Sequence, residues 1–308
     1  MTDVLIVGGG PAGLTASIYA ARAGLTVTVA ERQMAGGQMI TTAEIVNYPG
    51  FPEITGPELS RQMETQARKL GVSFVSREVT GLTLTPGALA VTTAKETLPA
   101  RALILAMGAQ RRKLDIPGED AFTGRGVSYC AVCDGGFFRG KRVAVVGGGN
   151  SALEDALYLS GICEKVTLIH RRDVFRGGKA LAASVKEASN VEFNLSCVPE
   201  AVEGERSVER ILVRHLATDE VDTLPVSALF VAVGTVPATA LLRTADNQKG
   251  LLPLDAEGRV TADESGHTEI PGVFVAGDLR KKALYQIVTA CADGAHAASA
   301  AAEFLAGH

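Results

Sequence analysis

The sequence contains no tryptophan, and only 5% of its residues are aromatic, so it offers few planar side chains on which nucleic-acid bases could stack. It also lacks a charge excess, because 30 basic and 34 acidic residues leave a net charge of −4. Such a chain has no general attraction to nucleic-acid phosphates or to an anionic membrane surface. We therefore expect no nucleic-acid partner.

The sequence has no uninterrupted apolar run of membrane length. Residues 4–21 and 224–242 are uncharged, but glycine and proline interrupt both stretches. The first stretch follows Asp3, whereas basic residues precede the apolar part of a signal peptide. We expect a soluble, cytoplasmic protein without a membrane partner.

Cysteine is scarce, and the odd number of five leaves at least one thiol unpaired, which is unlike a secreted disulfide framework. Cys130 and Cys133 are separated by two residues, and Asp134 follows directly. A Cys-x-x-Cys pair can close a small disulfide ring, and this spacing commonly lowers the pKa of one thiol. Asp134 is a candidate proton donor and acceptor for the pair. The segment is therefore a candidate redox centre.

Half of a zinc site is the alternative interpretation of Cys130 and Cys133. Zinc takes four ligands, usually completed by a second cysteine pair or by a closely spaced histidine pair. The cysteines at 163, 197 and 291 each stand alone, and the sequence has no His-x3-5-His pattern. The pattern favours redox chemistry.

A glycine-rich turn, Gly-Gly-Gly-Pro-Ala-Gly, occupies residues 8–13 between a predicted strand at 4–7 and a predicted helix at 14–23. In G-x-G-x-x-G the first glycine permits a tight turn, the second admits a pyrophosphate, and the third lets the helix pack closely. Glu31 ends the next predicted strand, 26–30, where a carboxylate can bind ribose hydroxyls. The unit predicts dinucleotide binding by Gly8, Gly10, Pro11, Ala12, Gly13 and Glu31.

The same pattern occurs again 139 residues later. This shift places Val7 on Val146 and Tyr19 on Tyr158, and it aligns the first turn with residues 147–152. An internal repeat of this length indicates two nucleotide-binding units. We expect the second nucleotide to be bound by Gly147, Gly149, Asn150 and Ser151.

The repeat changes at the end of its second strand, where His170 stands in place of Glu31. Arg171 and Arg172 follow, and Arg176 lies one helical turn further on. A carboxylate would repel a 2′-phosphate, whereas guanidinium groups can bind it through paired hydrogen bonds. The replacement predicts NADPH over NADH. The alternative, a solvated basic loop, does not explain why an expected acid is missing.

Further elements follow from apolar periodicity and from glycine or proline breaks. They are a helix at 57–70, strands at 74–79, 82–84, 88–93, 102–106, 141–146, 230–234 and 272–278, more strands within 190–224, and an alanine-rich helix at 283–305. The segments 110–119 and 238–248 are candidate hinges.

Segment 124–176, which contains 128–134, 147–152 and 170–176, resembles the low-molecular-weight thioredoxin reductases, class II FAD-dependent pyridine nucleotide-disulfide oxidoreductases. The resemblance extends over nearly the whole chain. It implies an α/β fold of two Rossmann-like, FAD- or NAD(P)-binding, three-layer ββα domains, and a homodimer. The FAD domain would comprise residues 1–112 and 244–308, and the domain for NADPH and the redox disulfide, 113–243, would be inserted between them.

The resemblance also implies an activity, that of a thioredoxin-disulfide reductase. Hydride would pass from NADPH to FAD, electrons would pass to the Cys130–Cys133 disulfide, and this pair would reduce thioredoxin or a thioredoxin-like protein. Cys133 would face the flavin, Cys130 would attack the partner's disulfide, and Asp134 would exchange protons. Rotation of the NADPH domain about the hinges would expose the thiol pair in turn to the flavin and to the partner.

The implied FAD contacts beyond the first unit are Gly37, Gln38, Asn47, Val79, Gly277, Asp278, Gln286 and Ile287, and the implied NADPH contacts include His170, Arg171, Arg172 and Arg176. Three positions depart from the family pattern. Met107 stands where threonine is usual, Tyr285 where arginine is common, and Ala238 where asparagine is frequent. These departures concern the flavin environment and domain closure.

Related proteins have other functions. A ferredoxin-dependent flavin reductase of this fold would lack the 2′-phosphate arginines, and an NADPH–ferredoxin enzyme would lack the cysteine pair. A peroxidase-linked flavoprotein would carry an additional N-terminal domain, which we do not expect here. A non-enzymatic redox sensor or nucleotide-binding module is the alternative from another class.

Overall fold

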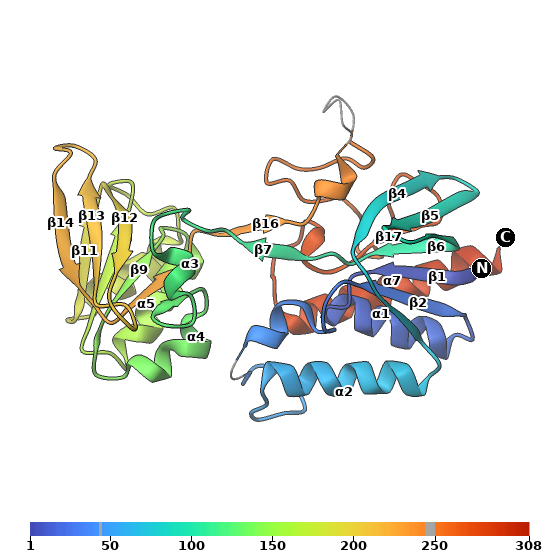
Figure 1. Ribbon diagram of the computed structural model, residues 1–308, viewed down its shortest axis with the longest axis horizontal. Helices are drawn as coiled ribbons and strands as arrows, with labels where there is room; N and C mark the ends of the chain where they lie inside the picture. The colour runs from blue at the N-terminus through green and yellow to red at the C-terminus, as the bar shows by residue number, and fades with distance from the viewer. Residues whose placement is uncertain (43–44, 244–249, 308) are drawn as a thin grey trace. The chain divides into compact units, whose positions relative to one another are not determined.

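The computed structural model describes residues 1–42, 45–243 and 250–307 (Figure 1). The chain forms two compact units, Met1–Gln110 with Val236–His308, and Arg111–Thr235, which is inserted between these two stretches of sequence. Each unit has a parallel sheet with helices on one face and antiparallel strands on the other. The predicted α/β fold with two Rossmann-like, three-layer units is confirmed.

In the first unit the sheet has the strand order β3-β2-β1-β6-β5-β4, and β17 also pairs with β6. The parallel strands are β1 (Thr2–Val7), β2 (Val27–Glu31), β3 (Ser73–Ser76), β6 (Thr97–Leu105) and β17 (Val273–Val275). The antiparallel strands β4 (Val79–Thr85) and β5 (Ala88–Thr93) extend the sheet from the first half of β6.

Alternate side chains of β1 enter two different cores, because successive residues of a strand point to opposite faces. Val4 and Ile6 pack with the helices α1 (Pro11–Arg22) and α7 (Ile287–Ala306). Leu5 and Val7 pack instead with residues of β4 and β5. Leu5 and Ile6 are fully buried, and burying each such side chain contributes about 1.5–3 kcal/mol. The short apolar run therefore joins all three layers.

In the second unit five parallel strands form a sheet of order β11-β10-β9-β15-β8. Its strands are β8 (Val127–Ser128), β9 (Arg142–Val146), β10 (Lys165–His170), β11 (Val191–Leu195) and β15 (Ala228–Val231). The helices α3 (Glu119–Phe122), α4 (Ala131–Asp134), α5 (Asn150–Ser160) and α6 (Lys179–Glu187) belong to the same unit. The separate antiparallel sheet consists of β12 (Cys197–Glu203), β13 (Arg210–His215) and β14 (Val221–Pro225).

The second unit repeats the core plan of the first. Val143 and Val145 of β9 pack with residues of α5, whereas Ala144 and Val146 pack with residues of the antiparallel sheet. The 139-residue sequence repeat thus corresponds to a repeated three-layer structure.

The chain passes between the units through β7 (Ala109–Arg111) and β16 (Thr235–Pro237), which pair as a two-stranded sheet. The 3₁₀ helix Ala240–Leu242 follows, and Leu242 is fully buried in the core that contains Leu5. The burial of Leu242 places this segment with the first unit, so the inserted unit ends before the predicted residue 243. Residues 244–248 of the predicted second hinge, 238–248, lie outside the described residues.

Several element boundaries differ from prediction. Helix α7 begins at Ile287 and not at 283, because Gln286 and Thr289 form a capping box that fixes its first turn. The predicted strand 74–79 ends at Ser76, and Val79 opens β4 instead. Helix α2 (Gly56–Lys69) agrees closely with its predicted span. Among the residues that the structure describes, none of the helices combines the length and apolar composition that a membrane crossing requires.

Candidate nucleotide-binding and redox sites

The first glycine turn needs glycine at two positions for steric reasons. Gly8 has a φ of +105°, and a Cβ atom there would lie 2.4 Å from the carbonyl oxygen of Ala106. A Cβ on Gly13 would lie 1.9 Å from the Gly8 carbonyl oxygen, so its absence lets α1 approach β1. At Gly10, by contrast, the nearest heavy atom to a built Cβ is 3.9 Å away. The turn is thus tight at Gly8, close-packed at Gly13, and open at Gly10.

Helix α1 begins directly at this turn. Its N-cap residue is Gly10, which has no side chain to bond the free N–H groups of the first turn, and Pro11 and Ala12 follow. Such a helix start offers N–H donors and the positive end of the helix dipole to an anion. The open space at Gly10 therefore suits a phosphate group.

Glu31, at the end of β2, lies beside the same turn. One carboxylate oxygen accepts a hydrogen bond from the Gly9 N–H at 2.8 Å, and the other accepts from the Gln33 N–H at 3.0 Å. These two backbone donors fix the orientation of the half-buried carboxylate. Its remaining acceptor positions are of the kind that bind ribose hydroxyls.

Two segments that are remote in sequence also adjoin the first turn. A Cβ on Gly37, where φ is +56°, would lie 3.1 Å from the Cα of Gly10. A Cβ on Gly277, where φ is +74°, would lie 2.8 Å from the Cβ of Ala12. The fold therefore brings Gly37 and Gly277 to the first glycine turn, and their part in binding FAD stays a prediction.

Further predicted FAD residues lie in the same unit. The Asn47 side-chain amide donates to the Gln286 side-chain oxygen at 3.2 Å, and that of Gln38 donates to the Ala109 carbonyl at 2.7 Å. Ile287 is the first residue of α7, and Val79 is half-buried at the start of β4. The side chains of Asn47 and Gln286 thus meet. The apolar side chain of Val79 instead packs against the core of this unit.

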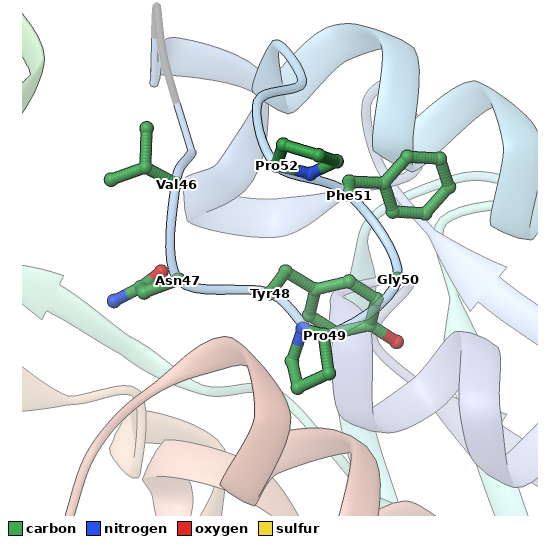
Figure 2. A pocket seen from close by; sticks show the side chains of 7 residues that line it. All are labelled: Val46, Asn47, Tyr48, Pro49, Gly50, Phe51 and Pro52. Atoms are coloured by element: carbon green, nitrogen blue, oxygen red, sulfur yellow. The ribbon is translucent and has the colours of Figure 1, made fainter.

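A pocket lies along the loop that contains Asn47. Residues 46–52 line it, and the side chains of Asn47 and Tyr48 point in opposite directions (Figure 2). The Tyr48 hydroxyl lies 3.7 Å from the sulfur of Cys291, and burial, together with Cys291, raises the pKa of Tyr48 to about 12. Tyr48 therefore carries its proton at neutral pH and holds the loop against α7.

The second glycine turn repeats the steric pattern of the first. Gly147 has a φ of +152°, and a Cβ there would lie 2.4 Å from the Ala232 carbonyl oxygen. At Gly149 a Cβ would meet no heavy atom of the described residues within 4 Å. Gly149 is also the N-cap residue of α5, so Asn150 and the exposed Ser151 open this helix. The second turn therefore offers a comparable open helix start.

His170 packs beneath this turn. Its side chain is almost completely buried, its ring stacks on Phe175 at 5.5 Å, and a Cβ on Gly148 would lie 2.1 Å from a ring carbon. Burial lowers the pKa of His170, and the nearby Arg176 lowers it further, although a bond to the Val174 carbonyl opposes the shift. The imidazole is therefore neutral at pH 7 and supports the turn from below.

The arginine segment is attached to the second turn through its backbone. The N–H groups of Arg176 and Gly177 donate to the Gly148 carbonyl at 2.7 and 3.2 Å. The Asn150 side-chain oxygen accepts from the Gly178 N–H at 2.8 Å. The side chains of Arg171, Arg172 and Arg176 are exposed. Three exposed guanidinium groups are thus carried by a segment that is hydrogen-bonded to an open helix start.

The candidate redox segment forms the short helix α4 in the second unit. Cys130 is half-buried and disulfide-bonded, whereas among the described residues Cys163, Cys197 and Cys291 are free. The Asp134 N–H donates to the Cys130 carbonyl at 3.1 Å and so closes the turn. This turn places the carboxyl group of Asp134 within the same segment as the disulfide-bonded sulfur.

Ser128 orients Asp134, a role that the sequence did not predict. Its hydroxyl donates to a carboxylate oxygen of Asp134 at 2.6 Å and accepts from the Cys130 N–H at 3.1 Å. In the described parts of the chain no group of three His, Cys, Asp or Glu side chains is placed to hold a metal. The bond to Ser128 holds the Asp134 carboxyl group in the same segment as the disulfide-bonded Cys130.

Comparison with known proteins agrees with this geometry. The family model described as pyridine nucleotide-disulphide oxidoreductase matches residues 2–294. The chain belongs to this family.

Among its relatives in the pyridine nucleotide-disulphide oxidoreductase family, a thioredoxin reductase of Treponema pallidum is 41% identical over 98% of this chain and 97% of its own. A bifunctional thioredoxin reductase/thioredoxin of Mycobacterium leprae is 42% identical over 99% of this chain and 66% of its own. The solved structure of a Lactococcus lactis thioredoxin reductase, 38% identical, superposes with a TM-score of 0.79 over the whole of both chains. The predicted resemblance to bacterial thioredoxin reductases is confirmed.

A second support of the redox segment in this family member also went unpredicted. The Tyr129 hydroxyl donates to Glu119, which is 2% exposed and also accepts the N–H groups of Leu114 and Asp115. Burial raises the pKa of Tyr129, and the bond to Glu119 raises it further. The protonated Tyr129, which directly precedes Cys130, is therefore held in place by its hydrogen bond to Glu119. The sequence around Glu119 gives no signal for this contact.

Proposed function

We propose that this chain is an NADPH-dependent thioredoxin-disulfide reductase that carries FAD in its first unit and binds NADPH in its second. One observation carries the proposal: a disulfide-bonded cysteine lies in the unit whose glycine turn is joined to three exposed arginines. The other unit offers an acid at the corresponding place. The two turns therefore suit two different nucleotides.

The residues present fit both cofactors. A Cβ atom would collide with neighbouring backbone at Gly8 and at Gly13 but not at Gly10. A bound pyrophosphate requires this open position. Glu31 would hold the adenosine ribose of FAD, and Arg171, Arg172 and Arg176 would hold the 2′-phosphate of NADPH. When bound, NADPH supplies a hydride, and FAD accepts it and passes two electrons to a disulfide.

The chain's own residues carry out the exchange with thioredoxin. The Cys130 thiolate attacks one sulfur of the partner's disulfide, which forms a mixed disulfide and releases a partner thiolate. The Cys133 thiolate then attacks the Cys130 sulfur, which restores the Cys130–Cys133 disulfide and releases the second partner thiolate. Asp134, oriented by Ser128, delivers a proton to one departing thiolate, and solvent protonates the other. Two electrons thus leave the cysteine pair and reduce the partner to a dithiol.

The partner is thioredoxin or a thioredoxin-like protein, and we propose a homodimer that acts in the cytoplasm. The fused thioredoxin of the Mycobacterium leprae relative supports this choice of partner. Three free cysteines in addition to the redox segment suit a reducing compartment. Size measurement in solution tests the dimer.

An absorption spectrum of the purified protein, before and after anaerobic NADPH, tests the cofactor assignment. We expect a flavin spectrum that bleaches with NADPH. A colourless protein that FAD cannot reconstitute would contradict the proposal, and bleaching by reduced ferredoxin alone would favour the ferredoxin-dependent alternative.

The substitution Cys130→Ser tests the thiol roles. It should abolish reduction of thioredoxin and leave reduction of the flavin by NADPH intact, because only the attacking sulfur is removed. Cys163→Ser, at a free thiol of the same unit, is the control and should keep both activities. Loss of both activities in Cys130→Ser would contradict the role given to this residue. A flavin-containing wild-type protein without thioredoxin-dependent turnover would favour the sensor.

A further inference from the structure

A cluster of buried charges lies beside the predicted FAD residues Gly277 and Asp278 in the first unit. Asp293 is 7% exposed, and the side chain of Lys282 is 6% exposed. Buried charges are costly unless each is paired. We name this the Asp293 cluster, and its members are Arg259, Asp278, Arg280, Lys282 and Asp293.

The ammonium group of Lys282 joins two carboxylates of the Asp293 cluster. Its Nζ lies 2.9 Å from Oδ2 of Asp293 and 3.4 Å from Oδ1 of Asp278. The same oxygen of Asp293 accepts the Gly277 N–H at 3.1 Å. One side chain thereby ties the 3₁₀ turn Gly277–Leu279 to the middle of helix α7.

Tyr285 contacts Lys282 and Arg259 near the end of the loop formed by residues 277–287. Its hydroxyl accepts the Lys282 N–H at 3.2 Å, and the Arg259 guanidinium lies 4.0 Å above its ring. Arg259 also donates to the Asp278 carbonyl oxygen. The family pattern commonly has arginine at position 285, and here Arg259 brings a guanidinium to that place from another segment. The closed loop, residues 277–287, carries the predicted FAD residues Gly277, Asp278, Gln286 and Ile287.

We propose that Lys282 is a positioning residue for FAD: it holds Asp278 and the Gly277 backbone in place without contacting the cofactor. The inference rests on the proposed binding of FAD in the first unit. Without the ammonium, Asp293 would keep the Arg280 guanidinium, whose Nε lies 3.3 Å from its Oδ1, whereas the link between Asp293 and Asp278 would be lost. The side chain of Asp278 would then be free to turn away, so the site would be less preorganised before FAD arrives and would bind it more weakly.

Lys282→Met is the test, since methionine keeps much of the apolar stem and removes the charge. Lys281→Met is the matched control, because Lys281 is the adjacent lysine and its side chain is exposed. FAD release is measured by flavin fluorescence on dilution, together with the visible absorption bands of the bound flavin. We expect FAD to bind about tenfold more weakly in Lys282→Met, with shifted bands, and to bind within about twofold of wild type in Lys281→Met.

Asp293→Asn is the second variant, and it decides the outcome if Lys282→Met does not fold. Asparagine keeps an acceptor for the Gly277 N–H and removes the charge that pairs with Lys282 and with Arg280. We expect FAD affinity to fall about threefold, again with shifted bands, which a purely structural loss of stability would not produce. If the folded variants bind FAD with the affinity and bands of Lys281→Met, the proposal is wrong. If the wild-type protein binds no FAD, the proposed function fails instead.

Discussion

The two glycine turns of this protein have the same backbone plan and different chemistry at the end of the following strand. In the first unit, Glu31 turns its carboxylate towards the backbone N–H groups of Gly9 and Gln33. In the second, the His170 ring is buried under Gly148, and the charge comes from exposed arginines beyond it. Under the proposed function, the turn provides the phosphate site and the residues after the second strand select the nucleotide.

The largest expected effects come from adding a methyl group to each turn separately. Gly8→Ala should prevent FAD binding, because the Cβ would collide with the Ala106 carbonyl at a φ of +105°. Gly147→Ala should retain FAD and lose NADPH for the corresponding reason. Backbone strain and overpacking each cost about 1–3 kcal/mol. Flavin absorbance and calorimetric titration with NADPH measure the two outcomes.

Gly87→Ala is the matched control for these variants. Its φ is +79°, but a Cβ there meets no heavy atom of the described chain within 4 Å. It should therefore bear the strain without losing either cofactor. If Gly8→Ala and Gly147→Ala each lost both cofactors to the same extent, the separate assignment of the two turns would be wrong.

The next largest effect is expected when the charges that distinguish the second turn are removed. Arg171→Ala with Arg176→Ala should raise the KM for NADPH far more than that for NADH, since only NADPH carries a 2′-phosphate. Two charge-assisted contacts are worth at most about 3–6 kcal/mol. Steady-state kinetics with both cofactors measure the ratio, and Arg206→Ala, at another exposed arginine of this unit, should leave it unchanged. An equal rise for NADH would refute the 2′-phosphate assignment.

A smaller effect is expected at the corresponding position of the first turn. Glu31→Gln keeps one carbonyl oxygen but loses the charge that accepts from Gly9 and Gln33. We expect FAD to bind about tenfold more weakly, because hydrogen bonds to a charged group contribute about 1.5–3 kcal/mol. The affinity for NADPH should not change. A loss of NADPH affinity alone would mean that the two turns have been assigned to the wrong nucleotides.

The smallest effect concerns stability. Asp155 of α5 corresponds in the repeat to Ala16, which is fully buried in α1. Burial among surrounding atoms raises the pKa of Asp155 to about 7, although Arg111 opposes the shift. Because the folded state favours the protonated acid, the contribution of this group to stability is present below pH 4 and is lost as the pH rises towards 7.

Asp155→Asn should remove this dependence on pH. We expect the variant to gain about 1–2 kcal/mol at pH 8 and almost nothing at pH 4, with the size reduced because part of the carboxyl group stays accessible to solvent. Thermal unfolding followed across this range measures the difference. A constant difference between variant and wild type at every pH would contradict the shifted pKa.

The sequence was sufficient for those features that local patterns determine. The apolar run at Val4–Val7, the glycine spacing at 8–13 and the 139-residue repeat predicted both turns and the two-unit fold. Helix α6 was not predicted, because it spans only nine residues and only Val185 among them is buried. Local pattern therefore identified the elements that form the core and missed one on the surface.

Features that depend on tertiary contacts could not be predicted. Three such contacts are seen only in the folded structure. They are the bond from Ser128 to Asp134, the burial of His170 beneath Gly148 and the pairing of Lys282 with Asp293. The sequence identified His170 as the replacement for an acid, but nothing in its neighbours distinguished a ring under the turn from one facing a nucleotide. Chemical type was readable from the chain, and side-chain direction was not.

Strand β17 and helix α7, which complete the first unit, are synthesised after the whole of the inserted unit. During translation, β6 cannot pair with β17, and Ala12 cannot pack against Gly294 of α7, until those later segments have been synthesised. The inserted unit is complete long before either arrives, so it can fold while its host is still open. The proposed flavin site is therefore assembled only after the inserted unit has been synthesised.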